Sequence, residues 1–349
     1  MNRSIYILFI SIFALFGCED SELPIVPETT GTPTGTALII TGAAARINQQ
    51  IALIERLHDQ NKLNNLDFVS GVSSGGINAI MLNGILDNTN DFGFESYKDI
   101  VLNLTNADVL DNSRNDLPID TKPLWNTFET KLLEELNYTS FDDLFMPTAL
   151  TSTNLDLKEI EFSSNITELD NIGGDLIESL MATTSFPVAF PSIKINDNIY
   201  VDGGLIENIP VNAVMEYQRI REAPFDTVYI VSYQKNTETR WSDELDYLSI
   251  SGTREDILKV TLEKAGFDTD ALSQQSFLNE LLRIANNYPE LASRCYVYVP
   301  NVADAPYYGV FDFSSETAHS SYNSVSIWAQ SNEPVPLDAY LAINGININ

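Results

Sequence analysis

The chain has 349 residues, of which 44% are hydrophobic and 10% aromatic. This composition is typical of a folded globular protein rather than of a disordered one. It carries 49 Asp and Glu residues against 19 Lys and Arg residues, which gives a formal net charge of −30 at pH 7. An acidic excess of this size repels the phosphates of nucleic acids and disfavours adsorption to anionic lipid surfaces. We therefore exclude nucleic acid as a partner.

The N-terminus has the pattern of an export signal. Arg3 precedes an apolar run, residues 5–16, that is shorter than a membrane span. The run ends in Leu15-Phe16-Gly17-Cys18, which resembles the lipobox of bacterial lipoproteins. The resemblance implies that residues 1–17 are a signal peptide and that Cys18 is lipidated. It also implies a lipid-anchored protein at the bacterial outer membrane or cell surface. An ordinary signal peptide that contains a cysteine is the alternative.

A flexible tether and then the folded domain are expected after Cys18. Residues 18–35 are rich in Pro, Thr and Gly, which favours a tether, and the domain is predicted to cover residues 36–349. The chain has two cysteines, so a lipidated Cys18 leaves Cys295 without a disulfide partner. The apolar run around Cys295 predicts a buried strand.

The beginning of the domain alternates strands and helices. Apolar residues at 37–40 and 68–69 predict buried strands, each followed by a turn. Helical spacing of apolar residues predicts helices at 47–57 and 77–86. This order predicts an α/β protein with a largely parallel sheet between helical layers.

Later segments continue the same alternation. We predict a helix from Leu124 to Leu136, a helix that begins at Pro210, and strands at 199–201 and 228–232. The stretch 240–290 is polar with a helical pattern. It is interpreted as a helical cap over a cleft, or alternatively as a peripheral helical insertion.

A nucleophile motif lies between the second predicted strand and helix. Gly71-Val72-Ser73-Ser74-Gly75 has the form G-x-S-x-G. A serine hydroxyl attacks efficiently only when it is exposed, close to a base and near positive dipoles. A sharp strand-to-helix turn exposes Ser73 and directs it along the helix N-terminus, while Gly71 and Gly75 leave room for the turn. The pattern therefore predicts Ser73 as a nucleophile, with a plain glycine turn as the alternative.

Two more motifs accompany this elbow in a characteristic order. Thr41-Gly42-Ala43-Ala44-Ala45-Arg46 follows the first strand, and Val201-Asp202-Gly203-Gly204 follows a later one. From about residue 37 to 232, the chain thus resembles the patatin-like phospholipase family. The resemblance implies a three-layer α/β/α patatin-like fold with a mostly parallel central sheet.

The same resemblance implies a mechanism without cofactor or metal. Asp202 would take the proton of Ser73 directly, forming a Ser–Asp dyad. Backbone N–H groups of Gly42, Ala43 and Ala44, with Arg46 close by, would hold the oxyanion. The implied reaction is hydrolysis of carboxylic esters of lipids through an acyl-enzyme, as in a phospholipase A or a lysophospholipase.

The first motif departs from the family pattern. The family's Gly-Gly-Gly is Gly42-Ala43-Ala44 here, and Ile47 stands where a glycine follows the arginine. Alanine keeps its N–H group, but any position that needs a positive φ is strained. A general carboxylesterase and a catalytically weakened lipid-binding lipoprotein therefore stay open as alternatives.

The two histidines of the chain allow a triad to be weighed against the dyad. Ser73, Asp202 and His319 follow the order of an α/β-hydrolase triad. However, Ser314 predicts the start of a helix that contains His319, whereas a triad histidine usually lies on a loop. His58 belongs to the first helix, ahead of the nucleophile. The sequence therefore favours the dyad.

Overall fold

The computed structural model describes residues 25–111, 113, 117–187, 189–235, 274–303 and 305–348. The strands are β1 (Thr36–Ile40), β2 (Leu66–Val72), β3 (Thr148–Asn154), β4 (Glu159–Ser164), β5 (Ile193–Ile195), β6 (Asn198–Asp202), β7 (Thr227–Val231), β8 (Cys295–Tyr298) and β9 (Val335–Pro336). The α-helices are α2 (Ile47–Asp59), α3 (Ser74–Leu86), α4 (Phe94–Leu102), α5 (Asn106–Val109), α6 (Lys122–Thr127), α7 (Leu176–Thr184), α8 (Val211–Ile220), α11 (Gln274–Asn287), α12 (Pro289–Ala292), α13 (Ser315–Ala329) and α14 (Leu337–Ile343). Shorter turns are η1 (Ala44–Arg46), η2 (Phe128–Glu134, a π-helix), η3 (Phe141–Asp143) and η4 (Gly203–Leu205).

Within the described residues, the strands form one nine-stranded sheet. Its order is β5-β6-β3-β2-β1-β7-β8-β9, and β4 pairs with β3. The five inner strands, from β3 to β8, run parallel to one another. The antiparallel pairs lie at the two flanks. The predicted α/β fold with a mostly parallel sheet is confirmed.

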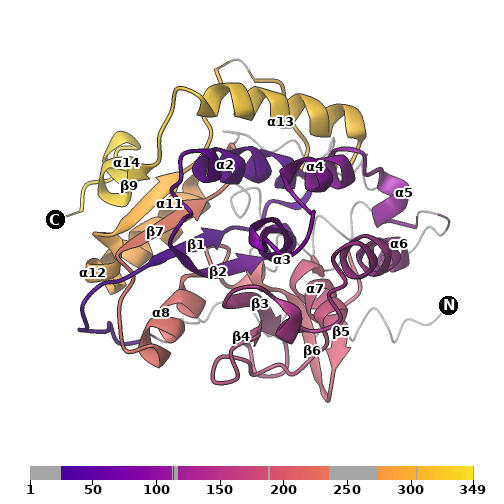
Figure 1. Ribbon diagram of the computed structural model, residues 1–349, viewed down its shortest axis with the longest axis horizontal. Coiled ribbons are helices and arrows are strands. Elements are labelled where there is room, and N and C mark those ends of the chain that lie inside the picture. Colours follow the sequence, from indigo (N-terminus) through magenta and orange to yellow (C-terminus); the bar gives the residue numbers. More distant parts are fainter. Residues whose placement is uncertain are drawn as a thin grey trace.

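The central strand β1 shows how the layers are built. Successive side chains of a strand point to opposite faces of the sheet. Leu38 and Ile40 pack into one apolar core with α2, α3 and α13. Ala37 and Ile39 pack into a second core with α8, α11 and α14. The sheet is therefore covered on both faces, and Figure 1 shows α2 and α13 on one side of it and α8 on the other.

The predicted segments of the first half are present with small changes in their ends. The helices predicted from Ile47 and Ile77 correspond to α2 and α3, and the strands around 37–40 and 68–69 to β1 and β2. The helix predicted from Leu124 to Leu136 begins as α6 and continues as the π-helical turn η2. Cys295 is buried in β8, where burial raises the pKa of its thiol to about 12.

Strand β3 was not predicted from the sequence, although it lies in the middle of the sheet. Its residues Thr148-Ala-Leu-Thr-Ser-Thr-Asn154 are mostly polar, yet the whole strand is buried. Internal hydrogen bonds offset this burial in part: the Thr148 hydroxyl donates to the Met146 carbonyl at 3.0 Å, and the Thr153 hydroxyl to the Asp202 carbonyl at 3.1 Å. A search for apolar runs does not detect such a strand.

The predicted cap and tether differ in part from the structure. Residues 1–24 and 240–273 lie outside the described residues, so the signal peptide, Cys18 and most of the cap are not seen. The end of the predicted cap is α11, whose apolar face packs into the core against the sheet. The end of the predicted tether lies on the domain: Val26 is buried and Glu28 accepts a hydrogen bond from the Leu291 N–H at 2.7 Å.

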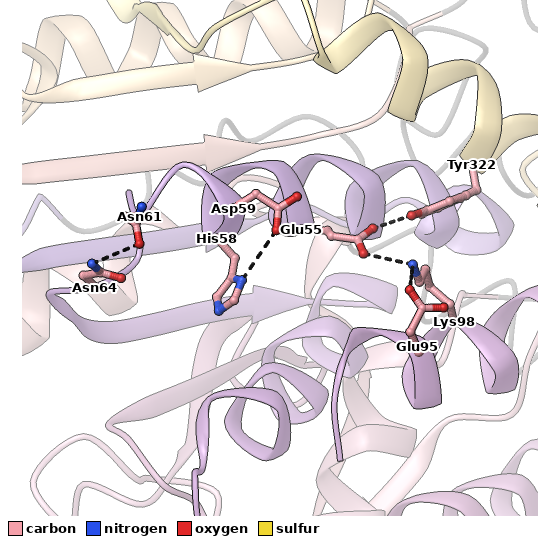
Figure 2. Close-up of polar contacts among 8 residues, drawn as sticks. All are labelled: Glu55, His58, Asp59, Asn61, Asn64, Glu95, Lys98 and Tyr322. Atoms are coloured by element: carbon pink, nitrogen blue, oxygen red, sulfur yellow. Dashed lines mark hydrogen bonds and ion pairs between the residues drawn. The ribbon is translucent and has the colours of Figure 1, made fainter. Parts of the chain in front are cut away.

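A polar cluster joins helices α2, α4 and α13 on one face of the sheet. Lys98 of α4 contacts Glu55 of α2 at 2.9 Å and Glu95 at 2.5 Å, and the Tyr322 hydroxyl of α13 donates to Glu55 (Figure 2). Because Lys98 and Glu55 are mostly buried, these contacts are better shielded from water than an ordinary surface pair. The cluster fixes α4 on α2, and α4 contributes a wall to the site described below.

No described helix has the length and apolar character that crossing a membrane requires.

Candidate active site

Ser73 lies at the junction between β2 and α3. Its backbone has φ 56° and ψ −133°, a conformation that residues other than glycine rarely adopt. The Ser73 N–H donates to the Thr183 hydroxyl at 2.9 Å, and that hydroxyl donates to the Thr151 carbonyl at 2.6 Å. Thr183 thus ties the strained turn to β3.

The glycines on either side of Ser73 are required by close packing. A Cβ atom added to Gly71 would lie 2.5 Å from the Gly75 carbonyl oxygen. One added to Gly75 would lie 2.3 Å from the carbonyl oxygen of Ile40 in β1. Both distances are shorter than real Cβ contacts allow, so any side chain at either position would push α3 away from the sheet.

Asp202 lines the same pocket as Ser73, although its strand β6 runs antiparallel to β3. Strand β6 runs antiparallel to β3, and Asp202, its last residue, pairs with Ser152. On the other edge of β3, Val72 pairs with Thr151. Asp202 therefore stops at the level where β2 turns into the elbow, and its carboxyl lies close enough to the Ser73 side chain for Ser73 to lower the pKa of Asp202.

The Asp202 carboxyl has the electrostatic properties of a base near neutral pH. Its side chain is buried, with 4% of the residue exposed. Burial raises its pKa to about 7, although hydrogen bonds from Ser73 and from the Gly204 N–H at 2.8 Å oppose the rise. Desolvation outweighs the hydrogen bonds because a carboxylate loses more hydration than two donors replace.

The loop after β1 passes directly beside Ser73. A Cβ atom on Gly42 would lie 3.0 Å from Cβ of Ser73 and 2.5 Å from Oδ1 of Asn208. Ala44 has φ 47°, so the strain expected from its replacement of a glycine is present. The Ala43 N–H donates to the Ser74 hydroxyl at 3.0 Å and is therefore already engaged.

Arg46 supports this loop from behind. It is 4% exposed, and its Nε donates to the Tyr308 carbonyl at 2.6 Å. Its guanidinium lies 5.2 Å from the centre of the Tyr233 ring and 5.8 Å from that of Tyr307. Arg46 is not among the described residues that line the pockets at Ser73. The contacts indicate that it braces the loop rather than facing the pockets.

Two pockets meet at Ser73. The larger pocket has a volume of about 820 Å³, part of which is open to solvent, and is almost entirely apolar. Its walls come from α3, α4, α6 and η2, and Lys131 is its one charged residue among those described. The smaller pocket, of about 480 Å³, contains Asp202. Both share Ala44, Ser73, Phe186 and Phe311.

The histidines lie away from these pockets. His319 is exposed on α13, and Ser314 caps that helix as predicted. His58, near the end of α2, pairs with Asp59 at 3.9 Å (Figure 2), and its ring packs 5.2 Å from that of Phe94. Neither histidine belongs to the pocket linings of the described chain.

Sequence reasoning did not assign a role to several residues of the site. Thr183 carries no motif, and only the fold shows that it holds the Ser73 N–H. Asn208 packs beside Gly42 and Gly204, and the signal for it was its position just after the D-G-G motif. Phe186 and Phe311 carry no motif, and only the fold brings them to the pockets at Ser73.

Comparison with known proteins identifies the family. The family model described as patatin-like phospholipase matches residues 38–215, about half of the chain. The crystal structure of VipD from Legionella pneumophila is similar with a TM-score of 0.37 and 12% identity, covering 92% of this chain and 73% of that one. That of the type III effector protein ExoU has a TM-score of 0.37 and 12% identity, covering 86% and 53%. No curated protein sequence matches.

The chain belongs to the patatin-like phospholipase family. This assignment rests on the sequence match, which contains all three motifs around Ser73 and Asp202. The chain is accordingly a lipid acyl hydrolase.

Thr183 provides a test of the elbow's support. We expect Thr183→Val to lower the free energy of unfolding by about 1–3 kcal/mol, because it leaves the Ser73 N–H and the Thr151 carbonyl without their shared partner. Urea denaturation measures this change. Thr183→Ser retains the hydroxyl and serves as the control. A Val variant as stable as the Ser variant would contradict the proposed support.

Proposed function

We propose that this protein hydrolyses carboxylic esters of lipids, in the manner of a phospholipase A or a lysophospholipase, with Ser73 as nucleophile and Asp202 as base. The observation that carries the proposal is that Ser73, at the junction of the two pockets, lines the smaller one together with the buried Asp202 carboxyl, whose pKa the Ser73 side chain lowers against the effect of burial. A nucleophile hydrogen-bonded to a desolvated base is the arrangement that serine acyl transfer requires.

The proposed reaction has two halves. In the first, Oγ of Ser73 attacks the ester carbon while its proton moves to Asp202, and the tetrahedral intermediate then expels the alcohol, which takes that proton. In the second, Asp202 removes a proton from water while the water oxygen attacks the acyl carbon, and the tetrahedral intermediate then expels Oγ of Ser73, which takes the proton back from Asp202 as the fatty acid is released. A carboxyl with a pKa near 7 can perform both transfers, because it gains and loses a proton with similar ease at neutral pH.

The shapes of the pockets support a lipid acyl ester as substrate. The larger pocket extends along α3 from Ser73 past Ile77 to Met81. Eight residues of helix correspond to about 12 Å, which accommodates a sizeable part of an extended acyl chain. The smaller pocket, beside Asp202, would then receive the alcohol portion. Burial of the acyl chain in an apolar pocket supplies the main binding energy.

Gly42 and Ala44 are proposed to supply the N–H groups that bind the oxyanion. Both line the smaller pocket together with Ser73. The Ala43 N–H could contribute only after its hydrogen bond to Ser74 breaks. This engagement, with the strain at Ala44, is the observation that favours the second candidate, a lipid-binding protein of weakened activity.

The proposal includes a lipid anchor at Cys18 and a location at the bacterial outer membrane or cell surface. Its support is the sequence Leu15-Phe16-Gly17-Cys18 after a short apolar run. An enzyme anchored beside a membrane meets its substrate at high local concentration.

The first test measures fatty acid released from phosphatidylcholine mixed micelles and from a short-chain ester. A chain that begins at Glu19 should release fatty acid from the phospholipid, Ser73→Ala should lose nearly all turnover, and His319→Ala should retain it. Release from the short ester alone would favour a general carboxylesterase. No release from either, with no labelling of Ser73 by a fluorophosphonate, would favour the lipid-binding protein.

The second test follows pH. Because Asp202 must be ionised to accept the proton, kcat/KM should rise with pH through about 7. Asp202→Asn should abolish the activity while the protein stays folded. A profile that shows no change between pH 5 and 8 would contradict the assignment of Asp202 as base.

Asp202→Asn should also stabilise the protein in alkaline solution. The pKa of Asp202 is raised from 3.8 to about 7 by folding, so its contribution to stability is present below pH 3.8 and is lost as the pH rises through 7. At pH 8, the Asn variant should unfold with a free energy about 2–4 kcal/mol greater than that of the unsubstituted chain. At pH 4 the two should be nearly equal, and urea titrations at both values measure the difference.

Cys18→Ser tests the anchor. The full chain should partition with membranes when expressed in a bacterium that processes lipoproteins, and the variant should appear in the soluble fraction. Fractionation followed by immunoblotting distinguishes the two. Membrane association that persists in the variant would refute lipidation at Cys18.

A further inference from the structure

A continuous chain of buried hydrogen bonds connects the larger pocket to the loop beside Ser73. The Tyr97 hydroxyl donates to Oδ1 of Asn78 at 2.7 Å, and Nδ2 of Asn78 donates to Oε1 of Gln50 at 3.0 Å. Nε2 of Gln50 donates to the Thr41 carbonyl at 2.7 Å. All four residues are buried, the most exposed being Tyr97 at 2%. The chain thus crosses α4, α3 and α2 and ends just before Gly42.

The last acceptor of the series, the Thr41 carbonyl, determines which group donates and which accepts in every hydrogen bond before it. The Thr41 carbonyl can only accept, so the Gln50 amide must present its nitrogen to Thr41 and its oxygen to Asn78. Asn78 must then present its nitrogen to Gln50 and its oxygen to Tyr97. The Tyr97 hydroxyl is therefore the donor that begins the chain, and each amide is polarised in the same sense.

The chain ends on a peptide bond that belongs to the proposed oxyanion site. The C=O of Thr41 and the N–H of Gly42 are parts of one planar peptide and point in opposite directions. A donor that holds the Thr41 carbonyl toward Gln50 turns the Gly42 N–H away from Gln50. Gly42 lies against Ser73 and lines the smaller pocket. Hydrogen bonding to the carbonyl also strengthens the N–H of the same peptide as a donor.

We propose that Gln50 and Asn78 are positioning residues that orient and polarise the Thr41–Gly42 peptide for oxyanion binding. The series of hydrogen bonds begins at Tyr97, which lines the larger pocket. An acyl chain bound in that pocket therefore packs against the first donor of the series. This inference rests on the proposed function, because it assigns a task to residues around the Ser73 nucleophile. It explains why three polar side chains are buried where apolar ones would fill the same core.

The neighbouring Gln49 provides a matched control. It lies on the same helix and is equally buried, with 1% exposed against 0% for Gln50. Its Nε2 donates to the Ser321 hydroxyl at 2.8 Å, and its Oε1 accepts from the Gln234 N–H at 2.8 Å. On substitution Gln49 loses two hydrogen bonds and Gln50 three, because Nε2 of Gln50 also donates to the Thr41 hydroxyl at 3.2 Å, and only Gln50 contacts the loop beside Ser73.

The test compares Gln50→Met with Gln49→Met in the chain that begins at Glu19. We expect Gln50→Met to lower kcat by about 10- to 100-fold with little change in KM, because it removes support that matters mainly in the transition state. Gln49→Met should keep kcat within about threefold even if it loses as much stability to urea. Tyr97→Phe, which removes a single hydroxyl, should lower kcat by a few-fold and serves if Gln50→Met does not fold.

A second readout separates positioning from general loosening of the fold. A long-chain trifluoromethyl ketone forms an oxyanion adduct with the serine, whereas the corresponding long-chain alcohol only fills the apolar pocket. Gln50→Met should weaken the ketone by about the factor lost in kcat/KM and leave the alcohol unchanged. Equal weakening of both ligands, or equal loss of kcat in the two methionine variants, would overturn the inference. Full activity in Ser73→Ala would instead overturn the proposed function itself.

Discussion

The close approach of Gly75 to the Ile40 carbonyl is the constraint on which the site depends. It allows α3 to start directly against the ends of β1 and β2, with no side chain between them. Ser73 is then held in a conformation with positive φ, and its hydroxyl is exposed in the pockets. The loop that follows β1 and the end of β6 both reach this point. One steric requirement therefore brings together Ser73, Asp202 and Gly42.

Buried polar side chains give the site its electrostatic character. Asp202 is desolvated, so its pKa rises toward neutrality and its affinity for a proton becomes useful for catalysis. Around it, Thr153, Thr183 and Gln50 each bond a backbone group of a strand end or loop. An unpaired buried polar group destabilises a fold, so these side chains specify one arrangement of the backbone. Hydrogen bonds within the core thus help to fix the positions of the backbone groups around the site.

Much of the fold and the main candidate residues could be predicted from the sequence. Apolar runs and helical spacing predict β1, β2, α2 and α3, because the apolar residues that each element buries recur at regular spacing within its own short segment. The elbow glycines, Ser73 and Asp202 were found through motifs. Strand β3 was missed because its polar residues, Thr148 to Asn154, are buried by pairing that no local pattern reveals. The end of the predicted cap proved to be the core helix α11, since an amphipathic pattern does not say which surface it covers.

The sequence alone determined that a serine in a tight glycine turn is followed, far along the chain, by an aspartate in a second one. Only the tertiary structure decided that the two residues line one pocket, because β6 runs antiparallel and ends level with β2. It also decided that Arg46 faces Tyr308 rather than the pockets, and that Gln50 holds the Thr41 carbonyl. These facts depend on strand order, direction and packing between distant segments. Such contacts belong to the conformation of lowest free energy of the whole chain, and no single stretch of sequence determines that conformation by itself.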